Sequence, residues 1–436
     1  MTLSKKPYRG TRDFFPKDKR IQDYMFSKMS DSAKLYGYEP YDGPLLEEVE
    51  LYQAKSGEEL INDQIYSFTD RGERFVAIRP EMTPTVARMV SQIHKEQAKP
   101  IRWFSIPNLM RYEKPQRGRL REHWQFNCDI FGAPGRYGEV EILQVATQLL
   151  QSLGANNSHF EILINDREIV DKIFTEVIKA NPEQTHRLYK IVDKSKKVDI
   201  AAINKMVNEV GLSDAGKEAF EEYLTLTDFT SLEFYLKKHN LIETFESFNE
   251  FLTILKNSKI EEYIKYDPTI VRGLDYYTGI VFEIFDKHPD NRRAICGGGA
   301  YANLLQIFNE NPLAGVGFGL GDVTLRDFLE VHQLLPNLEN DNYDIFITFQ
   351  DDMAREESLA IAQELRNAGV RTISNFEKVK FNKVFKQAEK KSVKFVSFMG
   401  EQELNSKTIL IKNLESKDQE EFNLSDVEKI KKLILN

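Results

Sequence analysis

The alternation of apolar and polar residues over positions 1–166 is typical of an antiparallel sheet decorated with helices. Short runs of β-branched and aromatic residues recur and end at turn signals. Other segments carry apolar residues at three- to four-residue spacing and predict helices over 17–36, 83–94 and 139–153. Because strands and helices do not alternate one by one, the pattern favours an antiparallel sheet over a βαβ fold.

Two prolines interrupt the apolar segment 38–52. Proline removes a backbone donor and restricts the residue before it, so Pro40 and Pro44 predict an extended, edge-like path for this segment. Two strands with the sequences IYSFTD and RFVAIRPEMTP follow, and we expect them to pair across the turn signal at Gly72.

The pattern changes twice further along the chain. From 167 to 265 the strand signature fades and amphipathic helical stretches dominate, which predicts a helical insertion domain. Strand character returns over 266–333, which we expect to complete the α+β core begun by 1–166. After a polar linker, strands alternate with helices over 342–436, and this predicts a separate C-terminal α/β domain.

Composition narrows the function classes. A chain of 436 residues with 41% hydrophobic and 29% charged residues is typical of a soluble globular protein with two or three domains. The net charge of −9 argues against general nucleic-acid binding, so such contacts would need local basic patches. Cys128 and Cys296 lack metal-binding spacing and are expected to be buried apolar residues. Without an apolar signal core or a membrane-length apolar run, the protein is expected to be cytoplasmic, with no membrane partner.

The segment VRGLDYYTGIVFE, residues 271–283, concentrates chemical groups on a short stretch of chain. Gly273 lets the backbone turn beside Arg272, and Tyr276 and Tyr277 add two flat, hydrogen-bonding rings. The apolar β-formers that follow predict a strand that holds the site rigid. These residues suit a small anionic and aromatic ligand; a hairpin with a surface arginine and packing tyrosines is the alternative.

A loop over residues 114–121 carries four basic residues and no acid, and lies between two predicted strands. Its basic residues are Lys114, Arg117, Arg119 and Arg121. The strand ends beside it carry further polar groups, at Arg111, Glu113, Gln125 and Asp129. A basic loop over a rigid sheet suits polyphosphate or a nucleic-acid end, although a solvated hairpin loop would have the same composition.

Two further patterns have a structural and a functional interpretation. Glu81 and Thr83 lie two apart on an extended segment, so they point to one face and together suit an ammonium group; Thr83 could instead cap the next helix. The chain has no P-loop sequence. The glycines of 315–321 indicate close backbone approach to a ligand, or close packing of a helix on the sheet.

Taken together, these motifs resemble the histidyl-tRNA synthetase family of class II aminoacyl-tRNA synthetases over nearly the whole chain. The N-terminal RGTRDFFP resembles that family's first signature, and YGYEPYDGPLLEEVELY resembles the class II dimer-interface motif. The second class motif is matched by MRYEKPQRGRLREHWQFNCDIFG. Two histidine-specific signatures are matched by VRGLDYYTG, almost letter for letter, and by CGGGAYANLL.

The resemblance implies a class II catalytic core, a helical insertion and a C-terminal anticodon-binding domain. It implies that histidine and ATP form histidyl-adenylate, which is then transferred to the 3′ end of histidine tRNA. Mg²⁺ is implied with the ATP, and a homodimer is implied as the assembly. Attack of a carboxylate on a phosphate brings two anions together, so fixed cations are the expected catalytic groups.

The resemblance also implies roles for individual residues. The expected catalytic cations are Arg272, which faces the amino-acid carboxylate and the α-phosphate, and Arg111, which binds the α-phosphate. The expected histidine-binding residues are Glu81, Thr83 and Gln125 at the ammonium group, Asp129 and Tyr277 at the imidazole nitrogens, and Tyr276 and Tyr301 lining the pocket. Glu113 and Arg119 are expected to join Arg111 and Arg272 at the ATP, and Arg117 and Arg121 are expected to contact tRNA.

Three positions depart from the family pattern. Asp129 stands where a glutamate is usual, and Ala300 and Ala302 replace the polar residues on either side of Tyr301. The third class motif usually ends in an arginine that holds the γ-phosphate, but the aligned residue is Thr324. Arg326 lies two residues on, which on a helix is a different face. Either another basic residue holds this phosphate or ATP binding is altered.

Two other functions remain open on the sequence. One is a catalytically silent relative that regulates ATP phosphoribosyltransferase in histidine biosynthesis; Thr324 favours it, while Arg272 and the C-terminal domain argue against it. The other is a tRNA-binding regulator that keeps only the fold.

The expected C-terminal domain contains a basic segment. Residues 371–400 hold eight basic and two acidic residues, a local balance of 8 − 2 = +6. Lys383, Lys386 and Lys390 recur at helical spacing and predict one basic face that contacts tRNA, with Phe376 and Phe381 available to stack on bases. A solvated helix face would show the same lysines.

Overall fold

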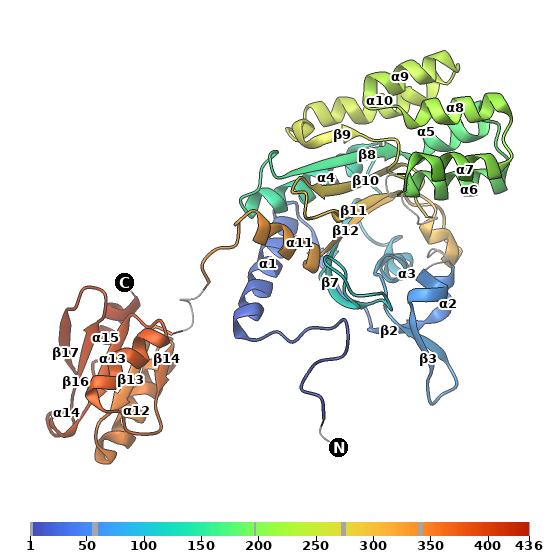
Figure 1. Ribbon diagram of the computed structural model, residues 1–436. Coiled ribbons are helices and arrows are strands. Elements are labelled where there is room, and N and C mark those ends of the chain that lie inside the picture. Colours follow the sequence, from blue (N-terminus) through green and yellow to red (C-terminus); the bar gives the residue numbers. More distant parts are fainter. Residues whose placement is uncertain (1–2, 55–59, 196–197, 272–275, 339–342, 436) are drawn as a thin grey trace. The chain divides into compact units, whose positions relative to one another are not determined.

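The computed structural model describes residues 3–54, 60–195, 198–271, 276–338 and 343–435. The chain forms two compact units, Met1–Leu335 and Pro336–Asn436, each with a hydrophobic core (Figure 1). Within the described residues, no helix has the length and apolar character needed to cross a lipid bilayer.

A mixed sheet of nine strands forms the centre of the first unit among its described residues. The six central strands, in the order β5-β7-β12-β11-β10-β8, are antiparallel to their neighbours, as the sequence pattern predicts. The short strands β1 and β9 add a parallel edge on either side, and β6 also pairs with β7. The strands are β1 Glu39–Pro40, β5 Ile101–Ser105, β6 Asn108–Met110, β7 Glu122–Phe131, β8 Phe160–Asp166, β9 Ile264–Tyr266, β10 Ile280–Asp286, β11 Ala294–Tyr301 and β12 Gly315–Gly321.

A small second sheet contains the expected hairpin. Strand β4 (Phe75–Ile78) pairs with β3 (Tyr66–Thr69) on one side and β2 (Leu46–Glu48) on the other, all antiparallel. The extended path expected for 38–52 is wrong at its end, because Val49–Gln53 forms the short helix α2. Its buried residues, Val49 and Tyr52, are three apart and so lie on one helical face.

Besides α2, which packs on β2 and β4, four longer helices outside the segment 167–265 pack on the sheets of the first unit or against its core. They are α1 Pro16–Leu35, α3 Thr83–Ile93, α4 Tyr137–Ser152 and α11 Asp322–Val331. Helix α4 contacts β7, β12, α1 and α10, and for this reason it is apolar on most of its surface. It thereby fixes the strands that carry the polar residues of the site.

The expected helical segment is present between β8 and β9. Its helices are α5 Arg167–Lys172, α6 Pro182–Lys194, α7 Ile200–Val210, α8 Asp214–Leu224, α9 Phe229–Lys238 and α10 Ile242–Lys256. Local caps set their ends: Asp166 caps α5, and Asn181 and Asp228 begin α6 and α9 with capping boxes. Helices α6–α10 gather at one end of the first unit (Figure 1), and their buried residues belong to the main core.

The second unit is a five-stranded sheet in the order β14-β13-β15-β16-β17. Strand β13 is parallel to β14 and β15, and the last two pairs are antiparallel. The elements are β13 Ile345–Phe349, α12 Arg355–Asn367, β14 Thr372–Ser374, α13 Phe381–Lys390, β15 Phe395–Met399, α14 Glu401–Ser406, β16 Thr408–Asn413, β17 Gln419–Asn423 and α15 Val427–Leu435. The sequence predicts these elements except α14 and the polar edge strand β17.

Candidate active site

An inner pocket lies over the central strands of the first unit. It brings together every residue expected to bind histidine, although they come from four separate parts of the chain. Its lining residues are Glu81, Thr83, Arg111, Gln125, Asn127, Asp129, Tyr276, Tyr277, Gly297, Tyr301, Gly317, Phe318 and Gly319. This convergence of polar and aromatic side chains is typical of a recognition site for a small molecule, and the free volume between them is about 50 Å³.

Strand β7 supplies one wall of the inner pocket. Gln125, Asn127 and Asp129 alternate along it and so share one face of the sheet. The neighbouring strand β12 carries glycines beside these side chains. A Cβ atom at Gly317 would lie 2.2 Å from Oδ1 of Asp129, and one at Gly319 would lie 2.7 Å from Cδ of Gln125. The glycines of this strand therefore make room for the polar side chains of β7.

Asp129 is the buried acid of the pocket. The hydroxyl of Tyr301 donates a hydrogen bond to its Oδ1. Burial raises the pKa of Asp129 to about 7, although the bond from Tyr301 opposes this shift. The carboxyl group can therefore gain or lose a proton near neutral pH.

The tyrosines and Glu81 form a second side of the pocket. The hydroxyl of Tyr276 donates to Oε2 of Glu81 at 3.4 Å, and its ring lies 4.7 Å from that of Tyr277. Thr83 begins helix α3, but Met82 holds the N-cap position and no side chain caps the helix. The alternative that Thr83 is an N-cap is therefore wrong, and its side chain lines the pocket instead.

An outer pocket of about 440 Å³ adjoins the inner one and shares Arg111, Gln125, Gly297 and Gly319 with it. Its volume is within the range of small-molecule and cofactor sites. The other lining residues are Glu113, Gly118, Arg119, Leu120, His123, Glu283, Phe285, Arg292, Arg293, Ala294, Ile295, Cys296, Gly321, Val323 and Thr324.

Charged groups of the outer pocket are held in place by neighbours. Arg119 and Glu113 form an ion pair, and Nε of Arg111 donates to the carbonyl oxygen of Pro80 at 2.9 Å. Burial, followed by the charge of Arg111, lowers the pKa of His123 to about 3. Its imidazole is therefore neutral at pH 7, and its buried Nδ1 has no hydrogen-bond partner among the described residues.

Arg117 and Arg121, the arginines expected to contact tRNA, lie outside both pockets. Arg117 is exposed, and its Nε donates to Oδ1 of Asn291 at 3.2 Å. Arg121 lies 4.0 Å from the ring centre of Tyr112 and donates to the hydroxyl of Tyr8 at 2.7 Å, so it fastens the N-terminal segment. Neither arginine lines a pocket described above, and Arg272 lies outside the described residues.

Comparison with known proteins identifies the family of this site. A model of the histidyl-tRNA synthetase family matches residues 10–323, more than half of the chain, and a model of the anticodon binding domain matches residues 343–433. The chain belongs to the histidyl-tRNA synthetase family. A relative from Leptospira biflexa named histidine–tRNA ligase is 42% identical over 432 residues and is matched over 98% of each chain. An Arabidopsis thaliana relative, named chloroplastic/mitochondrial histidine–tRNA ligase, is 34% identical over 97% of this chain and 86% of its own.

Solved structures share the fold. A histidyl-tRNA synthetase from Nostoc sp. has a TM-score of 0.79 at 22% identity, covering 99% of this chain and all (100%) of its own. A Bacillus halodurans protein described as an ATP phosphoribosyltransferase regulatory subunit/histidyl-tRNA synthetase has a TM-score of 0.76 at 21% identity, covering 92% of this chain and 99% of its own. At these identities the likeness concerns the fold alone.

The third class motif of this family member differs from the usual pattern in charge. Thr324 lines the outer pocket, and its hydroxyl donates to the carbonyl oxygens of Ile295 at 3.2 Å and Gly321 at 3.1 Å. Arg326 points away from it and pairs with Glu330 at 2.8 Å and Asp18 at 2.9 Å. The different helix face expected for Arg326 agrees with these contacts.

The N-terminal signature contacts the junction between strand β12 and helix α11, which begins two residues before Thr324. Arg12 donates to Oδ2 of the buried Asp322 at 2.7 Å, and the backbone N–H of Trp124 donates to Oδ1 at 2.9 Å. Arg12 also lies 4.9 Å from the ring centre of Phe14. This signature therefore fixes β12 and α11 against β7, close to Thr324.

Sequence reasoning missed several residues that line the pockets. They are Asn127, His123, Glu283, Arg292 and Arg293. The first two lie in register with Gln125 and Asp129 on β7, so their alternation was a usable signal. Arg292 and Arg293 end an irregular connection between strands, where no periodicity indicates direction.

Proposed function

We propose that this protein is an aminoacyl-tRNA synthetase, a histidine–tRNA ligase. The observation that carries the proposal is the inner pocket, in which Glu81, Thr83, Gln125, Asp129 and the tyrosines converge, opening onto an arginine-rich outer pocket. Relatives of that name, matched over nearly the whole chain, support the same activity.

The inner pocket has groups for each part of histidine. Glu81, Thr83 and Gln125 would hold the ammonium group, and Asp129 and Tyr277 would each pair one imidazole nitrogen. Analogues without these nitrogens would leave buried polar groups unpaired, which is how such a site rejects them.

Activation would take place where the two pockets meet. The carboxylate oxygen of histidine attacks the α-phosphorus of ATP, a new O–P bond forms, and pyrophosphate leaves with the electrons of the broken P–O bond. Arg111, which lines both pockets, would bind the α-phosphate, and Arg272 would neutralise the carboxylate and the same phosphate. A hydroxyl of the terminal adenosine of tRNA then attacks the carbonyl carbon and forms an ester bond. The bond from this carbon to the phosphate oxygen breaks, AMP leaves with its electrons, and the hydroxyl proton is released.

Mg²⁺ fits this site as a companion of ATP. Glu113 and Glu283 line the outer pocket, and no group of three or more candidate metal ligands occurs among the described residues. Mg²⁺ in nucleotide sites takes one or two carboxylates together with phosphate oxygens. Because Glu113 is engaged by Arg119, Glu283 would hold it together with phosphate oxygens, and it would neutralise phosphate charge.

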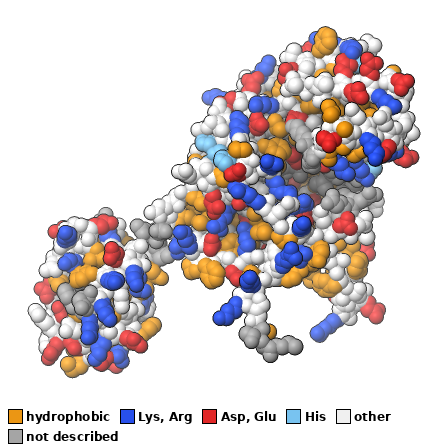
Figure 2. Space-filling model, in the orientation of Figure 1, with side chains coloured by type: hydrophobic (Ala, Val, Ile, Leu, Met, Phe, Trp, Pro, Cys, Tyr) orange, Lys and Arg blue, Asp and Glu red, His pale blue; other side chains and the backbone are white. Residues whose placement is uncertain are grey.

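The second unit would bind tRNA. Lys383, Lys386 and Lys390 are exposed on α13, and Phe376 is 78% exposed beside that helix in sequence. Basic and acidic side chains are interspersed on the face drawn in Figure 2, so local groups rather than a broad field would bind the tRNA. Arg117 and Arg121 belong to the same proposal, as does the division into core (1–166, 266–333), helical insertion (167–265) and anticodon-binding domain (342–436).

A cytoplasmic homodimer is the proposed form. Leu45 and Leu46 in the segment that resembles the dimer motif are 50% and 44% exposed, and Phe68 and Phe75 on the hairpin are 45% and 48% exposed. Leu46 and Phe68 share one face of this sheet, because they pair with Ile78 and Val76, two residues apart on β4. Exposed apolar side chains on one face are typical of an association surface.

The regulatory alternative is less well supported. The silent relative typically lacks an anticodon-binding domain, and that domain's model matches residues 343–433. The test is histidine-dependent ATP–pyrophosphate exchange followed by charging of histidine tRNA. Histidine binding without any exchange would overturn the proposal and favour the regulator.

A further inference from the structure

The connection between β10 and β11, residues 287–293, brings an arginine to the outer pocket at the place where the third class motif lacks one. Arg293 and Thr324 both line this pocket. A Cβ atom at Gly118 of the basic loop would lie 3.1 Å from Cδ of Arg293 and 3.4 Å from Cγ2 of Thr324. The two side chains therefore meet at one point of that loop.

Within the part of the chain that the structure describes, Arg293 is a cation without a counter-charge. It is half-buried, and among the described residues it has neither a hydrogen-bond acceptor nor an ion-pair partner. This half-buried position lowers the pKa of its guanidinium group. A partly desolvated and unpaired cation is unfavourable unless an anion joins it.

The other arginines near this point are committed or exposed. Arg119 pairs with Glu113, and Arg326 pairs with Glu330 and with Asp18. Arg292 also lines the pocket, but its side chain is exposed to solvent. Arg293 is thus the arginine of this set that combines partial burial with a free guanidinium group.

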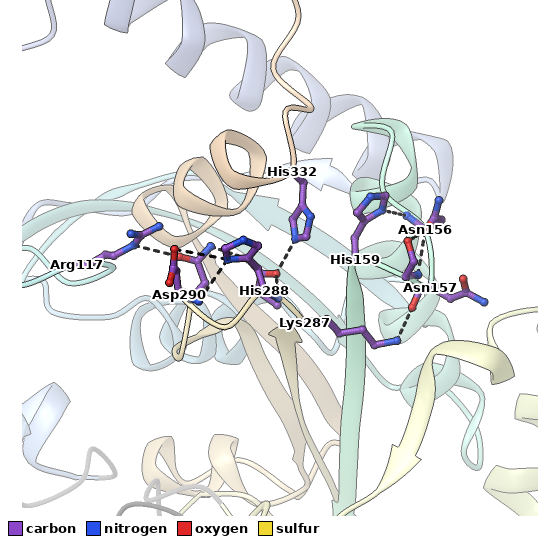
Figure 3. A network of polar contacts seen from close by, with 11 residues as sticks. Arg117, Asn156, Asn157, His159, Lys287, His288, Asp290 and His332 are labelled. Atoms are coloured by element: carbon purple, nitrogen blue, oxygen red, sulfur yellow. Dashed lines mark hydrogen bonds and ion pairs between the residues drawn. The ribbon is translucent and has the colours of Figure 1, made fainter.

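Buried contacts hold the connection that presents Arg293. Asp286, at the end of β10, accepts hydrogen bonds from the backbone N–H of His288 at 2.7 Å and from Nδ2 of Asn291 at 2.6 Å, and contacts Nε2 of His332 at 2.7 Å. Figure 3 shows His288 and His332 in the middle of the view, with Arg117 of the basic loop on the left. The connection is therefore fixed before a ligand binds.

The position of Arg293 indicates which part of a nucleotide it meets. The α-phosphate has to lie where the two pockets join, beside Arg111, because the amino-acid carboxylate attacks it there. Arg293 lines the outer pocket but not the inner one, so it is displaced from that junction. We infer that Arg293 binds the β- and γ-phosphates of ATP and stands in for the arginine absent at Thr324; this rests on the proposed function.

The experiment compares Arg293→Gln with Arg326→Gln, which removes an arginine that faces away from the pocket. Calorimetry measures binding of ATP and of AMP, which lacks the β- and γ-phosphates. Loss of a charge-assisted contact should weaken ATP binding by about 10- to 100-fold in Arg293→Gln. AMP binding should stay within about twofold of the wild type by the same reasoning, and Arg326→Gln should bind both nucleotides normally.

Equal weakening of ATP and AMP, or unchanged ATP binding, would overturn the inference. If Arg293→Gln unfolds, Arg293→Met, which also removes the charge, is measured instead: selective weakening of ATP relative to AMP supports the inference, and none overturns it. The proposed function fails separately. If the wild-type protein shows no histidine-dependent pyrophosphate exchange, the proposed function is wrong. If ATP binding nevertheless depends selectively on Arg293, the contact between Arg293 and the phosphates still stands.

Discussion

Tyr301 and Asp129 form a buried hydrogen bond between strands β11 and β7, in which the tyrosine hydroxyl donates to Oδ1 of the carboxyl group. The exposed fractions of the two residues are only 2% and 4%. Burial raises the pKa of Asp129 to about 7, and the bond from Tyr301 limits that rise. The acid proposed to recognise imidazole therefore changes its charge close to neutral pH.

Histidine should bind more tightly as pH rises through about 7, the pKa of Asp129 in the free protein. Below this pH the carboxyl group holds a proton, and above it the carboxylate is a stronger acceptor for a ring N–H. Asp129→Asn cannot ionise and should bind histidine about 10-fold more weakly at pH 8, where the charge-assisted bond is lost. Calorimetry of both proteins from pH 6 to 8 measures this.

The comparison of the two proteins is essential because the imidazole of the substrate titrates near pH 6.5 as well. That contribution is common to both proteins, so the difference between their pH profiles belongs to Asp129. Identical profiles for wild type and Asp129→Asn would contradict the role of Asp129.

Tyr277→Phe is expected to weaken histidine binding far more than ATP binding, without changing the shape of the pH profile.

Gly317 is expected to be as necessary as the acid beside it. In Gly317→Ala, the new Cβ atom would lie 2.2 Å from Oδ1 of Asp129, so the carboxyl group has to move. Overpacking of this kind costs roughly 1–3 kcal/mol, and we expect both the free energy of unfolding and the affinity for histidine to fall. Denaturant unfolding and calorimetry measure the two effects.

The control is Gly72→Ala in the β3–β4 turn, where the nearest atom would lie 3.4 Å from the new Cβ. This variant should unfold and bind histidine almost as the wild type does. If Gly317→Ala also binds histidine normally, then the pocket is more compliant than its geometry indicates.

The sequence predicts the antiparallel core, the helical segment and the α/β unit because long periodic stretches determine them. It does not predict helix α2, since Pro40 and Pro44 suggest an extended chain, nor β17, whose polar residues obtain strand structure only by pairing with β16. All seven residues that the motifs suggest for histidine binding line one pocket. Arg293 escapes prediction because the direction of its side chain depends on the tertiary contacts of Asp286 and Gly118.

Arg272 provides a test of the proposed chemistry that does not depend on pocket shape. Arg272→Ala should abolish adenylate formation while the protein stays folded, because a cation is needed between two approaching anions. Its loss should cost on the order of 3 kcal/mol of transition-state stabilisation. Pyrophosphate exchange measures the activity, and circular dichroism checks the fold; near-normal exchange would show that the assignment of Arg272 is wrong.

The exposed lysines of α13 are expected to contribute to tRNA affinity through phosphate contacts. Lys383, Lys386 and Lys390 lie on the solvent face of this helix, whereas Val384 and Ala388 are buried on the other. Each phosphate contact releases counterions, so tRNA affinity should fall with salt. The triple alanine variant should bind tRNA more weakly and show a shallower slope of log affinity against log salt.

A matched control comes from another helix of the same unit. Lys429, Lys431 and Lys432 on α15 can be replaced by alanine with the same change in net charge. If the α13 face makes the contacts, only its variant changes the slope, whereas a general charge effect changes both slopes equally. A slope unchanged in the α13 variant would exclude this helix as a tRNA-binding surface.

Deleting residues from 342 onward should preserve histidine-dependent pyrophosphate exchange, because the first unit has its own core and both pockets, and should sharply reduce tRNA charging.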